Sequence, residues 1–272
     1  MDGPLAGLPG ASTDAGEGTV VAPLVEGLLL GSASAQRHRE DRAAWYADLL
    51  GPLLVPATGL ADLQEELAAG EVAVRVVLTA EPGPGDPAGL LPLREARNRL
   101  LDDDRLELTG VHVPLPPGAA MPDLLAELDF SVPAWVEVPP EGGWREAVAA
   151  LAMDGAERLA LRLPGDGQTA GAVAEVLREA VDRDLSVRIT GAVPTPAVLA
   201  ALCAVRAALN GAEPPEIAAI LAERTTAPLA AALRRMSDAD AAVARVFLDA
   251  VVVDDVRDAV DDLVALGLVG PV

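Results

Sequence analysis

The sequence predicts an α/β protein in which parallel strands form a barrel-like sheet surrounded by helices. Short apolar segments rich in β-branched residues alternate with amphipathic helical segments, which is typical of βαβ units. Proline and glycine follow most of the strand-like segments, where turns are expected. The chain has 272 residues, 51% of them hydrophobic, a length and composition that suit one (β/α) barrel domain. A doubly wound open parallel sheet is the alternative.

Six segments are predicted as strands because they are short, apolar and bounded by turn residues. They are Pro52–Pro56, Val72–Thr79, Leu108–Leu115, Ala134–Val138, Leu159–Leu163 and Ser186–Gly191. Apolar side chains three and four residues apart predict helices between them, as at Leu60, Leu63 and Leu67. Because a crossover between parallel strands is right-handed, these units should curl in one direction.

The two ends of the chain depart from this alternation. Residues 1–20 are rich in glycine and proline and are predicted to be a flexible tail, followed by a single barrel-like domain over 21–272. A charged segment around Arg39 leads into an apolar helix that should end near Leu50. From Thr195 onward the chain is expected to be mostly helical.

The carboxyl-terminal region holds one more strand candidate. The six predicted strands and this candidate are fewer than the eight of a complete barrel, so the prediction includes an incomplete barrel. Arg245–Val253 ends in β-branched residues and precedes a last helix predicted at Asp254–Leu266. This strand would complete the sheet after the helical part of the chain.

Charge and cysteine content exclude several functions. The 20 basic residues minus 42 acidic ones give a net charge of −22, which repels nucleic acid and anionic membranes. Every basic residue is arginine, so a lysine Schiff base and a lysine-bearing P-loop are excluded. The single cysteine, Cys203, permits no internal disulfide. With no signal peptide or membrane span recognisable, we expect a cytoplasmic protein.

Alternation along the strands puts polar groups on the side that faces away from the helices, which is the barrel interior. These residues are Arg75, His112, Glu137, Arg162, Arg188 and Thr190. Glu137 and His112 are candidate catalytic residues that exchange protons. The three arginines and Thr190 are candidate ligands for a small anion such as a carboxylate or phosphate. The alternative is an ion-pair network that satisfies itself without any ligand.

Two glycines suggest a further anion contact. Gly165 and Gly167 lie in the loop after the fifth predicted strand, directly before a helix, where backbone N–H groups can approach an anion. An ordinary βα turn explains the same pattern. Metal binding is not predicted, because His38 and His112 lie far apart and only one cysteine is present. No cofactor is expected.

The chain from Ala180–Leu185 through to Asp262–Leu268, together with Gly51–Pro56 and Val136–Pro139, carries a resemblance that covers about two thirds of its length. These parts resemble an uncharacterised bacterial, actinobacterial-type family of TIM-barrel-like proteins. The resemblance implies a barrel fold. The family carries lysines on its fifth and sixth strands, then a His-His pair and an asparagine. This chain has Leu161, Arg188, Val193–Thr195 and Ala200 at the corresponding places.

These departures favour a catalytically degenerate barrel that acts as a binding or scaffold protein, with an anionic small molecule or a protein as its partner. The alternative is a metal-independent enzyme that acts on a small phosphorylated or carboxylate metabolite at the carboxyl ends of the strands. The oligomeric state is left open.

Overall fold

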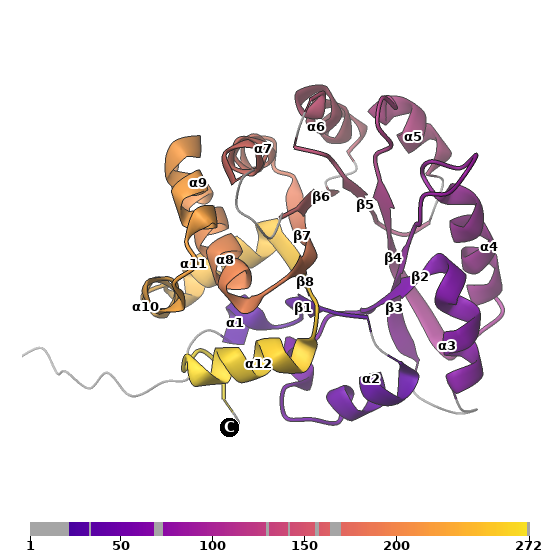
Figure 1. Ribbon diagram of the computed structural model, residues 1–272, viewed down its shortest axis with the longest axis horizontal. Coiled ribbons are helices and arrows are strands. Elements are labelled where there is room, and N and C mark those ends of the chain that lie inside the picture. The colour runs from indigo at the N-terminus through magenta and orange to yellow at the C-terminus, as the bar shows by residue number, and fades with distance from the viewer. Residues whose placement is uncertain are drawn as a thin grey trace, which may run out of the picture.

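A single parallel sheet curls into a nearly closed barrel (Figure 1). The computed structural model describes residues 22–32, 34–67, 73–128, 131–140, 142–155, 158–163 and 170–270. Within them the sheet has eight strands in the order β1-β8-β7-β6-β5-β4-β3-β2, and every neighbouring pair is parallel. The strands are β1 (Leu29–Leu30), β2 (Leu53–Pro56), β3 (Val74–Thr79), β4 (Leu106–Pro114), β5 (Ala134–Glu137), β6 (Arg158–Arg162), β7 (Ser186–Val193) and β8 (Leu248–Val253).

Helices cover the outside of this barrel, as the ring of ribbons around the strands in Figure 1 shows. They are α1 (Ala22–Val25), α2 (Ala35–Arg42), α3 (Leu60–Glu66), α4 (Leu90–Leu100), α5 (Met121–Glu127), α6 (Trp144–Asp154), α7 (Ala170–Asp182), α8 (Thr195–Leu209), α9 (Pro214–Ala222), α10 (Thr226–Arg234), α11 (Asp238–Phe247) and α12 (Val256–Ala265). Two short 3₁₀ turns, Ala47–Leu49 and Ala57–Gly59, flank β2. The α/β barrel-like fold predicted from the sequence is therefore confirmed.

The seam between β1 and β2 is the place where the barrel is not fully sealed. Leu29 and Leu50 form an isolated parallel bridge there. The N–H groups of Gly51 and Leu54 donate to the carbonyl oxygens of Leu29 and Gly31 at 2.9 and 3.1 Å. A Cβ at Gly51 would lie 2.9 Å from the carbonyl oxygen of Gly27, so only glycine allows the two chain segments to approach this closely.

The two faces of the sheet differ in composition. Outward-facing strand residues such as Val76, Val136 and Ile189 are fully buried against the helices in the main core. Inside the barrel, the residues Leu30, Leu54, Val77, Val252 and Ala250 form a separate small apolar cluster contributed by β1, β2, β3 and β8. The interior positions of β4 to β7 are left for larger polar and aromatic side chains, and these make the candidate site.

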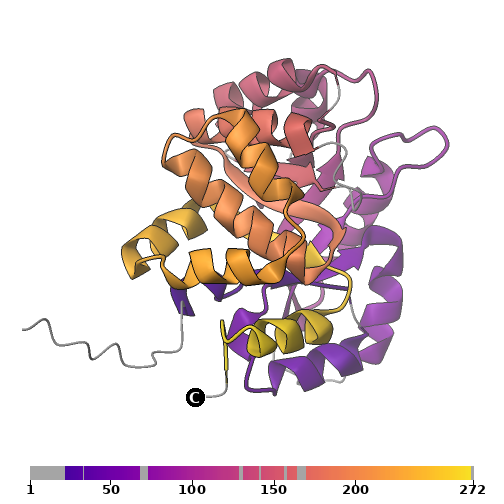
Figure 2. The ribbon, with the colours of Figure 1, turned by 60° about the vertical axis from the view of Figure 1, so that its left-hand side comes forward.

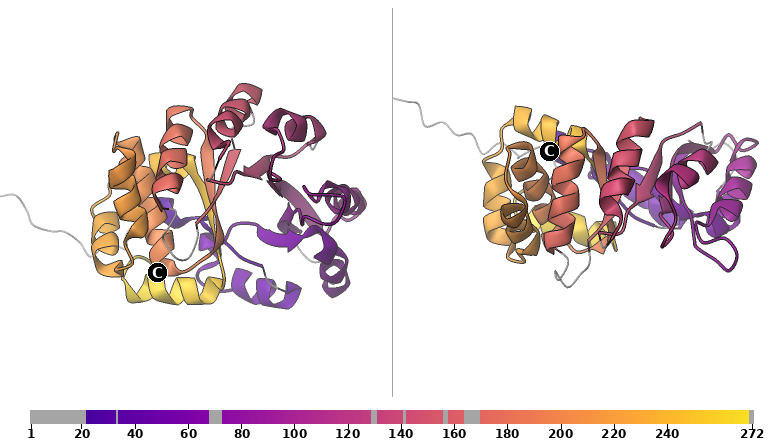
Figure 3. Two further views of the ribbon diagram at one scale, coloured as in Figure 1. Left: turned by 45° about the horizontal axis from the view of Figure 1, so that its top comes forward. Right: turned by 90° about the horizontal axis from the view of Figure 1, so that it is seen from above.

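A group of three helices, α9 to α11, lies between α8 and β8 in the chain and packs outside α8 (Figure 2). Because α8 is covered on both sides, it is apolar almost all round, with Leu199, Leu202 and Val205 nearly fully buried. Figure 3 shows this helical group standing on one side of the barrel. The expectation of a mostly helical chain after Thr195 is confirmed.

Three details of the sequence prediction were wrong. The further strand predicted at Arg245–Val253 exists as β8, but it begins only at Leu248, because α11 continues to Phe247. The charged segment is itself a helix, α2, and the apolar helix expected to end near Leu50 is only the short 3₁₀ turn Ala47–Leu49. The two-residue strand β1 was not predicted, since a strand this short shows no alternation.

The boundaries of the six predicted strands agree with the structure within two residues wherever both ends are described. The predicted tail, residues 1–20, lies outside the described residues, as do Val72, Gly165 and Gly167. No helix in the described part of the chain is long and apolar enough to cross a membrane.

Candidate functional site

Glu137, the last residue of β5, lies at the centre of a polar cluster near the carboxyl ends of four adjacent strands. Arg162 at the end of β6 donates from Nε to Oε1 of Glu137 at 2.8 Å. Thr190 on β7 donates its hydroxyl to Oε2 at 2.7 Å. Nε2 of His112 on β4 lies 3.3 Å from the same Oε2. One carboxylate therefore connects β4, β5, β6 and β7.

Strand alternation explains why these side chains meet. Val136 and Val138 are completely buried on the helix side, so Glu137 between them points into the barrel. His112 lies between Val111 and Val113 in the same way. Since the strands are parallel and in register, their inward side chains near the carboxyl ends come together.

Hydrogen bonding controls the ionisation of Glu137. Burial would raise the pKa of this carboxyl group, whose side chain is only 12% exposed. The hydrogen bonds from His112, Thr190 and Arg162, together with the charge of His112, outweigh burial and lower the pKa to about 2. Glu137 is therefore a carboxylate at neutral pH.

This arrangement limits the chemistry available to Glu137. A general acid must hold a proton at the working pH, and an efficient general base has a pKa near that pH. Glu137 satisfies neither condition, and both of its oxygens already accept hydrogen bonds from the chain itself. Arg162, with a 62% exposed side chain, is the member of the cluster that faces solvent. The carboxylate thus holds an arginine at the mouth of the barrel.

A second charged pair lies deeper in the barrel. Nε and Nη2 of Arg188 on β7 donate to Oδ2 of Asp249 on β8 at 2.9 and 2.6 Å. The guanidinium carbon of Arg188 also lies 3.5 Å from the ring centroid of Trp135 on β5, and that of Arg158 lies 5.3 Å from it. Arg188 is one of the largest buried side chains, at 2% exposure.

The local structure makes room for this stack. A Cβ at Gly110 on β4 would collide with the ring of Trp135, so glycine is required where the indole crosses the neighbouring strand. Burial lowers the pKa of the Arg188 guanidinium, and the charge and hydrogen bonds of Asp249 act in the opposite direction. Asp249 therefore compensates the buried positive charge of Arg188.

The structure brings together some of the predicted site residues and separates others. His112, Glu137, Arg162 and Thr190 form one cluster. Arg188 lies two residues before Thr190 on β7, one interior layer nearer the amino-terminal end, and pairs with Asp249 and not with Glu137.

The expectation that Arg75 points to the same interior site was wrong. Arg75 is the second residue of β3, so it lies at the opposite, amino-terminal end of the barrel and is exposed. The alternation rule gave the correct side of the strand but does not specify the height of a residue along the barrel axis. The predicted contacts of Gly165 and Gly167 fall outside the described residues.

Sequence reasoning missed two interior residues, Trp135 and Asp249. Trp135 has the same parity as Glu137 on β5, so alternation alone would have placed it inside the barrel. Asp249 gave no such signal, because a register irregularity separates Val187 and Arg188 where β7 pairs with β8. This irregularity lets an acid between two apolar residues, Leu248 and Ala250, reach Arg188.

Several buried nitrogen atoms of this interior have no hydrogen-bond partner in the described part of the chain. They are Nδ1 of His112, Nε1 of Trp135 and Nη1 of Arg188. Buried polar atoms without partners are rare and point to a water molecule or a ligand atom. The three residues belong to β4, β5 and β7, so the polar interior retains a capacity for further hydrogen bonds.

Metal and thiol chemistry find little support in the described residues. These residues include no group of three or more His, Cys, Asp or Glu side chains suited to a metal ion. Burial raises the pKa of the Cys203 thiol to about 11, and its Sγ lies 3.8 Å from the carbonyl oxygen of Leu229. A buried thiol with a raised pKa is a poor nucleophile.

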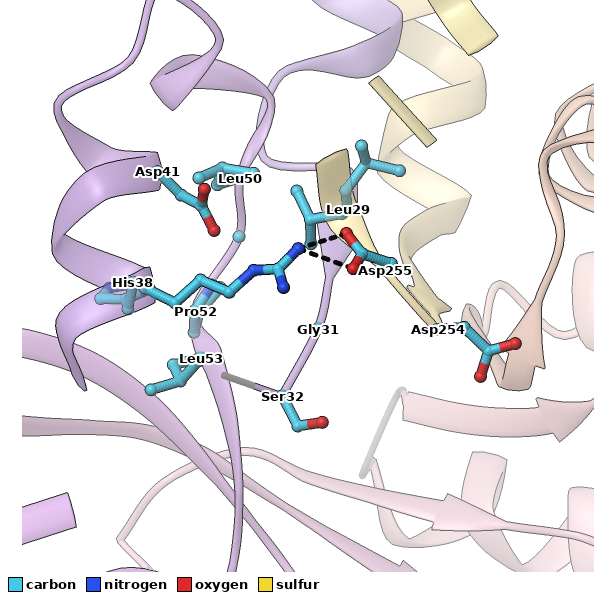
Figure 4. Close-up of a pocket in the computed structure, with 13 residues that line it drawn as sticks. Leu29, Gly31, Ser32, His38, Asp41, Leu50, Pro52, Leu53, Asp254 and Asp255 are labelled. Atoms are coloured by element: carbon cyan, nitrogen blue, oxygen red, sulfur yellow. Dashed lines mark hydrogen bonds and ion pairs between the residues drawn. The ribbon is translucent and has the colours of Figure 1, made fainter. Parts of the chain in front are cut away.

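A small pocket of about 180 Å³ opens on the outside of the seam between β1 and β2 (Figure 4). Nη2 of Arg37 on α2 donates to both carboxylate oxygens of Asp255 at 2.8 and 2.6 Å, and these bonds cross the pocket. Asp254 lies apart from this pair in Figure 4. Since Asp255 caps the first turn of α12, this ion pair in the lining of the pocket joins α2 to α12.

No protein-family model matches this chain, and no curated protein is significantly similar to it.

Proposed function

We propose that this chain is a catalytically degenerate TIM-barrel-like protein that acts by binding and does not catalyse a reaction. The observation that carries this proposal is the state of Glu137. It occupies the position at which barrel enzymes place catalytic groups, yet it is ionised and saturated by donors from His112, Arg162 and Thr190. Such a carboxylate stabilises the barrel and fixes an exposed arginine at its mouth.

An enzyme that acts on a small anionic metabolite is the second candidate, and one observation favours it. Nδ1 of His112 is buried without a partner, while Nε2 of the same ring faces Glu137. A histidine oriented by a carboxylate is a common proton-transfer arrangement. In this candidate, Arg162 would hold the anion and His112 would exchange the proton.

Replacing Glu137 by glutamine tests the first proposal against the second. If the carboxylate is structural, Glu137→Gln should lower stability by about 1–3 kcal/mol, because hydrogen bonds to a charged group are lost. For a chain of this size the melting temperature should then fall by about 2–4 °C for each kcal/mol. If Glu137 is instead kept for catalysis, the substitution should leave the melting temperature unchanged or raise it.

A matched control removes the general effect of deleting a carboxylate. Glu127 is 60% exposed and lies 3.7 Å from Arg94, so Glu127→Gln should change stability by less than about 0.5 kcal/mol. Equal effects of the two substitutions would contradict a structural role for Glu137.

Ligand binding at the mouth of the barrel is tested by a thermal-shift screen of phosphorylated and dicarboxylate metabolites. A ligand that stabilises the wild type but not Arg162→Gln would support binding at this end. Turnover of any of these compounds that is lost in both Glu137→Gln and His112→Gln would overturn the non-catalytic proposal in favour of the enzyme.

A further inference from the structure

A second and larger cavity lies at the amino-terminal end of the barrel, away from Glu137. Its volume is about 620 Å³, within the range of small-molecule sites. It opens between α2 and the first residues of β3 and β4, next to the residues that precede β2 at the seam with β1. The residues that line it are His38, Arg39, Arg42, Ala43, Leu50, Gly51, Pro52, Ala73, Val74, Arg75 and Glu107.

The polar lining of this cavity is cationic. Three of the 20 basic residues of a chain with net charge −22 face it, namely Arg39, Arg42 and Arg75, against one acid, Glu107. Arg39 and Arg42 are three residues apart on α2 and so lie on the same face of that helix. Arg75 approaches from β3 on the other side. An excess of positive charge in so acidic a protein marks a local preference for anions.

The arginines differ in how they are held. Nη1 of Arg42 donates to the carbonyl oxygens of Ala47 and Leu50 at 3.1 and 3.3 Å, which fixes its guanidinium at the rim. Arg75 is exposed and makes no hydrogen bond or ion pair with any residue that the structure describes, although Glu107 is its neighbour on β4. A guanidinium without a partner at the wall of a cavity is available for a ligand.

The remaining lining is apolar or neutral. Leu50, Pro52 and Val74 supply hydrocarbon surface beside the arginines. Burial, followed by the charge of Arg42, lowers the pKa of His38 below its ordinary value of 6.5, so this histidine is mainly neutral at pH 7. The cavity therefore combines an apolar surface with cationic groups on two sides.

We propose that this cavity binds a small organic carboxylate that carries an apolar chain. The carboxylate would pair with Arg75 and with the guanidinium of Arg42, because a planar guanidinium binds a carboxylate through two hydrogen bonds. The chain of the ligand would cover Leu50 and Pro52. This site is distinct from the cluster around Glu137, so it stands whether or not the barrel is catalytic.

Octanoate is the probe that tests the proposal, with octanamide as its uncharged counterpart. Isothermal titration of the full chain should show saturable octanoate binding and binding of octanamide that is about tenfold weaker or more. Arg75→Gln should weaken octanoate binding by about fivefold or more. Since Arg75 is exposed, the variant should fold. Glu107→Gln should tighten binding, because it removes a like charge.

The matched control is Arg235→Gln, which removes an exposed arginine at the end of α10 that does not line the cavity. This variant should bind octanoate as the wild type does. Any one of four results would overturn the proposal. Two concern the ligand: octanoate does not bind, or octanamide binds equally well. Two concern the variants: Arg75→Gln leaves octanoate binding unchanged, or Glu107→Gln weakens it.

The two histidines of the chain locate the bound probe. His38 lines this cavity as well as the pocket at the seam, and His112 belongs to the Glu137 cluster, so their ring signals in NMR spectra distinguish the α2 side of the barrel from the mouth around Glu137. Octanoate should shift the signals of His38 and leave those of His112 in place. Shifts confined to His112 would place the ligand at the carboxyl-terminal mouth and would contradict the proposal made here, while supporting a ligand at the mouth.

Discussion

Arg188 donates two hydrogen bonds to a single carboxylate oxygen of Asp249, although 61 residues separate the two in the chain. Arg188 is 2% exposed, whereas the side chain of Asp249 is 32% exposed. The guanidinium also stacks on Trp135. The pair connects β7 to β8 inside the barrel. In the chain, these two strands are separated by α8 and by the helical group α9 to α11. Stability should therefore depend on the two partners to different degrees.

Asp249→Asn should destabilise the protein strongly. The substitution leaves the buried Arg188 guanidinium without its counterion, and removing one partner of a buried ion pair costs about 3 kcal/mol or more. Arg188→Met should cost less, because Met can fill the space against Trp135 and the remaining Asp249 can be hydrated. Urea denaturation of both variants measures the two costs, and a larger loss for Arg188→Met would contradict this account.

Gly110→Ala should also destabilise the barrel, because a Cβ at this position collides with the ring of Trp135. Overpacking of this kind typically costs about 1–3 kcal/mol. In a Trp135→Leu background the added methyl group has space, so the same substitution should cost much less there. The coupling energy from a double-mutant cycle is the measurement.

Gly171→Ala is the control for this prediction. Gly171 lies in α7, and no heavy atom is within 4 Å of a Cβ built there. Alanine should therefore stabilise the helix by about 0.5–1 kcal/mol. If Gly110→Ala lowers the free energy of unfolding equally in the wild-type and Trp135→Leu backgrounds, the contact with Trp135 does not cause the destabilisation.

The sequence was sufficient to predict the barrel-like fold and the inward side of most strand residues. Val136 and Val138 on either side of Glu137 carry that information locally, because a strand covered by helices needs an apolar outer face. The same alternation predicts that His112 and Thr190 point inward.

The partners of the charged residues could not be predicted in this way. Alternation specifies a side but no height, so Arg75 at the start of β3 and Arg162 at the end of β6 looked equivalent. Asp249 reaches Arg188 only through the register irregularity between β7 and β8, which depends on strand pairing. The amino-terminal cavity depends on how α2 packs across the seam, a tertiary feature with no sequence period.

Glu137 should make the stability of the protein depend on pH in the acid range. Its pKa is about 2 in the folded chain and is expected near its ordinary value of 4.5 in the unfolded chain. The folded state therefore binds fewer protons between these values, so the stabilising contribution is complete above about pH 4.5 and is lost as the pH falls toward 2.

Comparison with Glu137→Gln isolates this contribution from those of the other carboxylates. The difference in free energy of unfolding between wild type and variant should be largest at pH 7 and should shrink steadily below pH 4.5. Urea denaturation between pH 7 and pH 3 gives this difference. A difference that stays constant over this range would show that the ionised form of Glu137 has no special stabilising role.

The ion pairs between α2 and α12 should hold the unsealed side of the barrel closed. Arg257 on α12 donates to Asp41 at 2.6 Å and to Glu40 at 2.8 Å, and Tyr46 donates to the same Asp41 oxygen at 2.8 Å. Asp41 is buried, so it depends on Arg257 for compensation of its charge. Since few backbone hydrogen bonds join β1 to β2 in the described part of the chain, we expect the ion pairs between α2 and α12 to contribute to the stability of this side.

Arg257→Gln should therefore loosen α2 and α12 locally without unfolding the rest of the barrel. Arg257 is partly exposed, so we expect amide hydrogen exchange in these two helices to become about two- to fivefold faster. High salt should produce a smaller change in the wild type, because it screens the exposed pair between Arg257 and Glu40 more than the pair with buried Asp41. Arg145→Gln, which removes an exposed pair with Glu175 between α6 and α7, should leave exchange in α2 and α12 unaltered. Acceleration spread evenly over all helices would mean that Arg257 supports global stability and that the seam is not a separate weak point.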